Sequence, residues 1–127
     1  WVQRARAQQQ PPEVLFGLDV REDSLPQDVI GETRALWERG EKRAAIALLY
    51  RSALSVLIHQ YAFRFNSGHT EQECANIVAG SDCSECHWFV DNITRAWQQT
   101  AYAHLPPDEQ AWHALCEHWP EFSSRGE

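Results

Sequence analysis

The residues with the clearest chemical potential lie in one short stretch, Cys83-Ser84-Glu85-Cys86-His87. Two thiols at this spacing, followed at once by a histidine, match the pattern that attaches a c-type haem covalently, with the histidine as axial ligand. Thiols at the same spacing also occur in zinc sites and in redox sites. The motif is therefore compatible with three kinds of chemistry, and also with two thiols that have no special role.

The haem and zinc interpretations both need further ligands. The chain has no Met, so a haem iron would take its sixth ligand from another histidine or keep that position open. A zinc ion bound by Cys83 and Cys86 would also take His113 and Cys116, which lie one turn apart on a predicted helix. Cys116 belongs to an apolar helical face, however, and a core of this size does not need a metal.

The redox interpretation depends on a cysteine near a helix N-terminus, where the pKa of a thiol is lowered. The chain has neither the Trp-Cys-Gly-Pro sequence nor the alternation of strands and helices that is typical of thioredoxin. We adopt the simplest interpretation, in which Cys83 and Cys86 are ordinary thiols at a helix entrance, carry no cofactor and can be replaced without loss of the fold. Cys74 and Cys116 lie on apolar helical faces, so we expect both to be buried.

The longest apolar pattern in the chain predicts a central helix at residues 41–61. This segment has no Gly and no Pro, and its apolar residues recur at steps of three and four. The polar remainder is a narrow strip that includes Ser55 and His59. Neighbouring elements must cover such a helix on most sides, so we expect Leu49 and Leu57 to be nearly inaccessible.

A helical hairpin is predicted around the central helix. One helix begins with Ser24 as its cap, and Gly40 ends it in a left-handed conformation just before the central helix. This pair is similar to one tetratricopeptide repeat, but no second copy follows, so we do not expect a solenoid. Residues 13–25 are expected to form an extended arm that Phe16 and Leu18 fasten to the helices.

Three further helices complete a predicted all-α, five-helix bundle. Thr70 and Glu73 form a capping box that begins a short helix. A long helix is expected at residues 85–103, and a last one at residues 108–119, where Pro120 ends it.

Composition indicates one ordered domain. The chain has 127 residues, 43% of them hydrophobic, and a net charge of −7, which disfavours nucleic acid and anionic membrane surfaces as partners. We place a juxtamembrane linker at residues 1–13, the helical domain at 14–122 and a disordered tail at 123–127. Two arginines beside Trp1 are typical of the cytoplasmic end of a membrane helix, so we expect the chain to be part of a longer protein.

The aromatic residues favour a binding function. Six Trp are many for one small core, and Trp88 falls off the apolar face of its helix. An exposed Trp88 with Phe63 and Phe65 would form a docking patch for a partner protein. Alternatively, Trp88 covers the loop at residues 81–86. The chain contains no Gly-rich phosphate loop, no Gly-x-Ser-x-Gly and no His-Glu-x-x-His, and we expect no enzymatic activity.

A resemblance to a known family extends over residues 14–119 and rests on packing motifs. These are Phe16-Gly17-Leu18-Asp19-Val20, Ser24-Leu25-Pro26, the hairpin up to Leu54, Thr70-Glu71 with Cys74, Trp97 with Ala101-Tyr102, and Leu115-Cys116 with Trp119. Together these motifs resemble the C-terminal domain of the family DUF4129 (domain of unknown function 4129). The chain departs from that family at Tyr102-Ala103, where the family has Tyr-Gly, and in the segment 83–87.

The resemblance implies a docking or accessory module of a membrane-anchored bacterial protein, on the cytoplasmic side of the cell inner membrane. It implies a MoxR-type AAA ATPase or a von Willebrand factor A protein as the partner. It supplies no catalytic residues. The membrane would be reached only through a transmembrane segment that this chain does not contain. The alternative to this docking function is a metal or redox site at Cys83 and Cys86.

Overall fold

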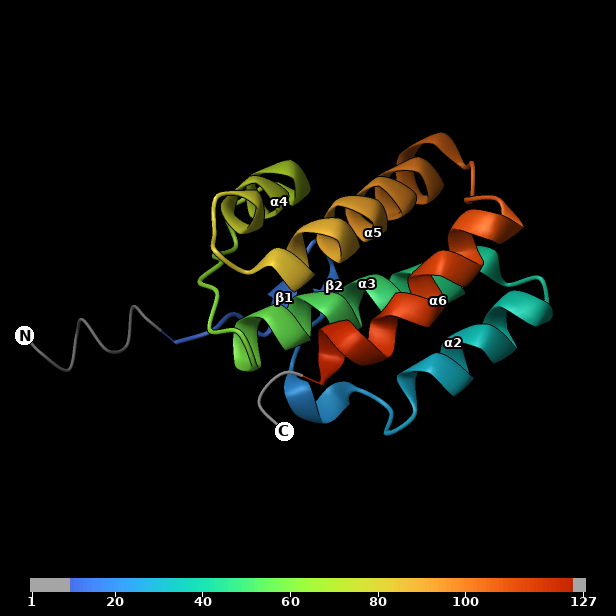
Figure 1. The fold of residues 1–127 in the computed structure, drawn as a ribbon, viewed down its shortest axis with the longest axis horizontal. Coiled ribbons are helices and arrows are strands. Elements are labelled where there is room, and N and C mark those ends of the chain that lie inside the picture. The colour runs from blue at the N-terminus through green and yellow to red at the C-terminus, as the bar shows by residue number, and fades with distance from the viewer. Residues whose placement is uncertain (1–9, 125–127) are drawn as a thin grey trace, which may run out of the picture.

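The computed structural model describes residues 10–124 (Figure 1). This part of the chain contains five α-helices, one short β-hairpin and one 3-10 helix, joined by loops. In chain order the elements are β1 (Val14–Leu15), β2 (Leu18–Asp19), the 3-10 helix η1 (Glu22–Ser24), α2 (Val29–Glu38), α3 (Lys42–His59), α4 (Glu71–Ala79), α5 (Ser84–Ala103) and α6 (Glu109–Ser123). The prediction of an all-α five-helix bundle is confirmed. The predicted linker at residues 1–13 and tail at 123–127 lie mostly outside the described residues.

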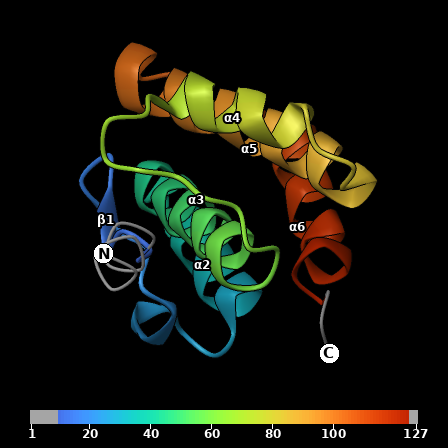
Figure 2. The same cartoon turned by 90° about the vertical axis from the view of Figure 1, so that its left-hand side faces the viewer.

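Helix α3 crosses the middle of the bundle, between the α4–α5 pair and α2 (Figure 2). All of its residues from 48 to 58 are buried except Arg51, which is partly buried. Leu49 and Leu57 are 0% and 1% exposed, as the apolar pattern predicts. Ser55 of the polar strip is 1% exposed, because neighbouring elements cover that side of α3 as well.

The turn between α2 and α3 has the geometry that Gly40 predicts. Gly40 has a φ of 84°, in the left-handed region. Its N–H donates to the Trp37 carbonyl at 3.0 Å, and the Glu41 N–H donates to the Leu36 carbonyl at 2.9 Å. These two bonds define a Schellman motif, which satisfies carbonyls at the end of α2 and reverses the chain into α3.

Helix α2 begins later than the sequence pattern predicts. Asp28 is the N-cap, and its Oδ1 accepts a hydrogen bond of 2.9 Å from the Gly31 N–H. Ser24 cannot begin the helix because Leu25 precedes Pro26, and a residue before proline is displaced from the α region. Leu25 is indeed extended, with φ −85° and ψ 145°.

The N-terminal arm is a tight β-hairpin rather than a single extended segment. Leu15 pairs with Leu18, and the two residues between them, Phe16 and Gly17, have φ of 56° and 77°. Positive φ at both central residues is characteristic of a type I′ turn. The residues that anchor the arm are Leu15 and Val20, which are buried, whereas Phe16 and Leu18 are only partly buried.

Helix α6 continues past Pro120, which was predicted to end it. Its last turn is held by tertiary contacts: the Phe122 ring stacks on Phe89 at 4.6 Å, and the Tyr61 hydroxyl donates to the Phe122 carbonyl at 2.6 Å. At the other end of α6, Trp112 stacks on Trp37 of α2 with ring centroids 4.4 Å apart. Burial of these rings offsets the single hydrogen bond that a proline removes from a helix.

The capping box that begins α4 is present. The Thr70 hydroxyl accepts from the Glu73 N–H at 3.0 Å, and the Glu73 carboxylate accepts from the Thr70 N–H at 2.9 Å.

Among the described residues, no helix combines the length and the apolar character needed to cross a membrane.

Truncation of the α3 core should be costly. We expect Leu49→Ala to lower the free energy of unfolding by about 2–5 kcal/mol, through lost burial and the cavity left behind. Leu105, which is 61% exposed, supplies the control: Leu105→Ala should change stability by less than about 0.5 kcal/mol. Urea denaturation of both variants measures the difference, and equal losses would contradict the central position of α3.

The left-handed conformation of Gly40 yields a second test. Gly40→Ala should destabilise the chain by about 1 kcal/mol or more, because a Cβ is strained at positive φ even where space is open. Gly80 ends α4 with a φ of −83°, so Gly80→Ala should be neutral or slightly stabilising. Thermal melts of the two variants should therefore shift differently, and a similar loss in both would show that strain at Gly40 is not the cause.

Candidate functional site

Cys83 and Cys86 form a disulfide at the beginning of α5. Cys83 is the N-cap residue and Cys86 lies in the first turn, and the two residues are 8% and 0% exposed. The expectation of two ordinary thiols at a helix entrance is therefore wrong, because the sulfurs are bonded to each other and packed in the core. Replacement of these cysteines also cannot be treated as a surface change.

The disulfide geometry is not that of a haem attachment site. A vinyl group adds to a free thiol, whereas both sulfurs here are joined in one bond. The neighbouring His87 directs its Nε2 at the Ser81 carbonyl, 2.9 Å away, and so holds the loop before α5 rather than a metal.

The predicted zinc ligands do not come together. Cys116 is buried in the core as a free thiol, whereas His113 is exposed and lies 3.7 Å from Glu109 on its own helix. Within residues 10–124, no three His, Cys, Asp or Glu side chains are arranged so that they could hold a metal ion. The zinc site built on Cys83, Cys86, His113 and Cys116 is therefore not supported.

The prediction that Cys74 and Cys116 are buried is confirmed, and neither belongs to a disulfide. Burial, with Glu71 and Glu73 nearby, raises the pKa of Cys74 to about 12. Burial also raises the pKa of Cys116 above its ordinary value. Both thiols therefore stay protonated at neutral pH, which makes them unreactive packing residues.

A buried carboxylate that the sequence pattern did not single out joins α4 to α5. Glu71 is only 9% exposed, and its Oε2 accepts hydrogen bonds from Trp97 Nε1 at 3.1 Å and from the Tyr102 hydroxyl at 2.5 Å. The hydrogen bond to Glu71 raises the pKa of Tyr102, because the neutral phenol is the form that donates. Next to it, Tyr50 of α3 stacks on Trp97 at 5.5 Å.

This carboxylate cluster brings together motifs that are distant in the sequence. Thr70-Glu71, Trp97 and Tyr102 are among the residues that carry the family resemblance, and the last three of these meet at one carboxylate oxygen. Arg43 adds a cation above the Trp97 ring, 5.7 Å from its centroid. Because both donors and the acceptor are engaged with one another, we interpret the cluster as a structural tie among α3, α4 and α5. In the sequence, Glu71 directly follows the helix cap Thr70. A glutamate at that position is usually exposed to solvent, so the pattern did not indicate that it is buried.

Trp88 is exposed, but it does not form one patch with the two phenylalanines. Its ring stacks on His118 of α6 at 4.2 Å and is 41% exposed. It lines a shallow hollow of about 130 Å³ between α5 and α6. In the alternative interpretation Trp88 covers the loop at residues 81–86, but the aromatic contacts of its ring within residues 10–124 are with His118 and Phe89.

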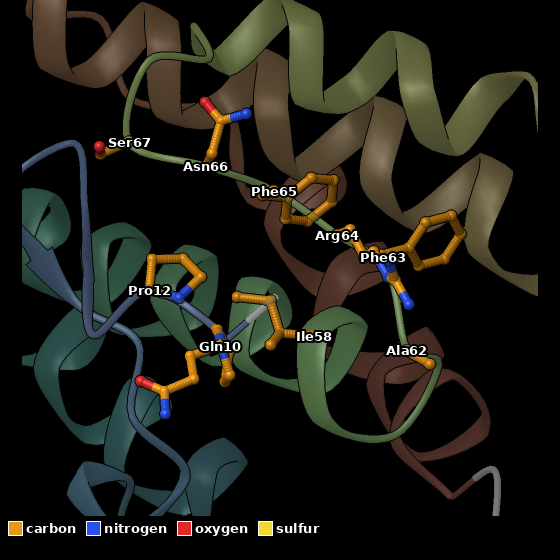
Figure 3. Close-up of a pocket in the computed structure, with 10 residues that line it drawn as sticks. Gln10, Pro12, Ile58, Ala62, Phe63, Arg64, Phe65, Asn66 and Ser67 are labelled. Atoms are coloured by element: carbon orange, nitrogen blue, oxygen red, sulfur yellow. The ribbon is translucent and has the colours of Figure 1, made fainter. Parts of the chain in front are cut away.

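Phe63 and Phe65 lie in a separate groove of about 530 Å³ (Figure 3). Their rings stack on each other at 6.0 Å. Phe63 is partly buried, whereas Phe65 is 5% exposed and belongs to the core, so the prediction that Phe65 is part of a surface patch is wrong. One wall is the non-helical segment 62–67, which follows α3, and the other wall is residues 10–12 of the N-terminal arm. Ile58 lies between the two walls, and Arg64 is the lining residue within 10–124 that carries a charge.

The groove exists because the chain leaves α3 abruptly. Ala62 has a φ of 60°, which turns the backbone out of the helix and into the non-helical segment. After that segment, Asn66 and His69 close a tight turn: the Asn66 N–H donates to His69 Nδ1 at 3.1 Å, and the His69 N–H donates to the Asn66 carbonyl at 3.0 Å. A positive φ at alanine has no signal in the sequence, so the groove could not be predicted from it.

Comparison with family models, with curated proteins and with solved structures finds no match for this chain. The fold and the sites described above are therefore the basis on which a function is proposed.

The structural role of the Glu71 carboxylate can be tested by removing either the acceptor or one of the donors of its hydrogen bonds. Glu71→Ala should cost about 1–3 kcal/mol, because it leaves the Trp97 indole N–H without its acceptor inside the bundle. Tyr102→Phe, which removes one donor at a more exposed position, should cost less. Glu117→Ala on the exposed side of α6 is the control. The free energy of unfolding of each variant is measured by denaturant unfolding. A loss in Glu71→Ala no larger than that in Glu117→Ala would contradict the structural role.

Proposed function

We propose that the chain is a non-enzymatic protein-interaction module, and that the groove of Phe63 and Phe65 is its binding surface. The observation that carries the proposal is a groove lined by aromatic rings and bounded by two segments without helix or strand structure, residues 10–12 and 62–67. Aromatic side chains provide large contact areas at interfaces, and a groove of this size accepts the side chains of a short peptide.

The occupant we propose is an extended segment of a partner protein. The backbone N–H groups of Arg64 and Phe65 have no hydrogen-bond partner among residues 10–124, so the segment 62–67 offers two unpaired N–H groups at its middle, between the bonded N–H groups of Phe63 and Asn66. An extended peptide can pair with such an edge while its alternate side chains enter the groove. On the opposite wall Pro11 and Pro12 restrict the backbone, which lowers the entropy lost on binding.

The charge of the groove indicates the chemistry of that peptide. Arg64 is exposed and, among the described residues of the lining, is the charged one, so a carboxylate on the peptide would meet it directly. Phe63, which is only partly buried, would receive an apolar or aromatic neighbour of that carboxylate. The net charge of −7 opposes acidic partners at long range, but salt screens that repulsion beyond about 8–10 Å.

The resemblance to DUF4129 extends the proposal. By that resemblance we place the module on the cytoplasmic side of the cell inner membrane, in a membrane-anchored bacterial protein. The peptide would then belong to a MoxR-type AAA ATPase or to a von Willebrand factor A protein.

The experiment is a selection of displayed peptides on the immobilised chain, followed by affinity measurements on variants. Selected peptides should share an acidic residue next to an apolar or aromatic one. Arg64→Glu should weaken their binding at least about tenfold, since each factor of ten corresponds to 1.4 kcal/mol. Arg39→Glu, at an exposed arginine directly after α2, is the matched control and should bind normally.

Two outcomes would contradict this proposal. Peptides that bind Arg64→Glu and the parent chain equally well would show that the groove is not the site. Loss of binding in Trp88→Ala with normal binding in Arg64→Glu would place the interaction in the hollow between α5 and α6 instead.

A further inference from the structure

The Cys83–Cys86 disulfide can add little stability to the fold. It joins residues only three positions apart, so it restricts the unfolded chain far less than a bridge across a long loop would. A core of this size does not need such a restraint. The other two cysteines, Cys74 and Cys116, remain free in the same core, so the chain does not use disulfides as a general framework.

We propose that Cys83 and Cys86 form a thiol–disulfide exchange site, which takes two electrons from a dithiol and returns them to a disulfide. The proposal is independent of the peptide groove, because the pair lies at the opposite end of α4, at the beginning of α5. Two cysteines in a Cys-x-x-Cys arrangement, with the first one at the N-terminus of a helix, are suited to this chemistry.

The two sulfurs are not equally accessible. Cys83 is 8% exposed and Cys86 is fully buried, so we assign the sulfur of Cys83 as the one that an incoming thiolate attacks. Cys86 then becomes the leaving group. It lies in the first turn of a 20-residue helix, whose positive N-terminal end stabilises the thiolate that departs.

The exchange balances in two steps. A donor thiolate attacks Cys83 Sγ, a bond forms between these two sulfurs, the Cys83–Cys86 bond breaks, and Cys86 leaves with the electron pair and takes up a proton. The second thiol of the donor then attacks the donor sulfur in the mixed disulfide, which releases Cys83 as a thiolate that is protonated in turn. The sum is one protein disulfide and one dithiol converted into one protein dithiol and one donor disulfide, with two electrons and two protons transferred.

The surroundings favour one class of donor. Asp82 and Glu85 are exposed on either side of Cys83, and Glu85 and Glu121 line a hollow at the same end of α5. These carboxylates repel small anionic thiols such as glutathione. The substrate class is therefore a dithiol that carries no anionic groups beside its thiols, either on a protein or as a small neutral molecule.

The first test uses the unmodified chain without denaturant. After exposure to millimolar dithiothreitol and an acid quench, alkylation of the unfolded chain counts the reduced cysteines by mass. We expect the count to rise from two to four within minutes while the far-UV circular dichroism is unchanged, and glutathione to act at least tenfold more slowly. Reduction that requires denaturant, or that proceeds at the rate of global unfolding, would show a merely structural bond and overturn the proposal.

The second test compares matched single variants. Cys86→Ser leaves the more accessible sulfur and Cys83→Ser leaves the buried one. With the neutral reagent dithiodipyridine, the Cys86→Ser variant should form a mixed disulfide at least tenfold faster than the Cys83→Ser variant. Equal rates, or a faster Cys83→Ser variant, would overturn the assignment of Cys83 as the attacked sulfur, and the measurement on the unmodified chain decides the matter if either variant fails to fold.

Discussion

The structure depends on the coverage of α3. A helix that is buried on nearly every side cannot be stable alone in water, because its apolar surface would be exposed. Helices α2 and α5 pack along it, α4 lies on α5, and α6 packs against both α5 and α2. Each of these helices is amphipathic and supplies one apolar face, so the arrangement follows from the need to enclose α3. The tight turn at Gly40 brings the first of them into place.

Burial alone does not determine how the outer helices are oriented, and a few polar contacts provide that specificity. Glu71 accepts from Trp97 and Tyr102, which fixes α4 relative to α5. Thr33 of α2 donates to the Ala45 carbonyl of α3 at 2.6 Å. A buried polar group without its partner costs free energy, so each pair disfavours a shifted packing of the same apolar faces.

The two proposed sites use different properties of the bundle. The peptide groove lies where α3 ends and the backbone leaves the helix, and its rings and unpaired amides suit recognition rather than chemistry. The cysteine pair lies at the positive end of α5, where a thiolate is stabilised. A disulfide in a reducing compartment is usually transient and engaged in exchange. The proposed cytoplasmic location is therefore compatible with the disulfide if the pair cycles between its oxidised and reduced forms.

The sequence by itself determined the five helices, the central position of residues 41–61, the capping box at Thr70 and the left-handed Gly40, because periodicity, propensity and caps are local properties. Tertiary contacts decided the rest. Pro120 lies within α6 because Phe122 is packed against Phe89, which no local rule anticipates. The separation of Trp88 from Phe63, the burial of Glu71 and the Cys83–Cys86 bond likewise depend on which faces meet in space, and that choice is made by packing among segments distant in the chain.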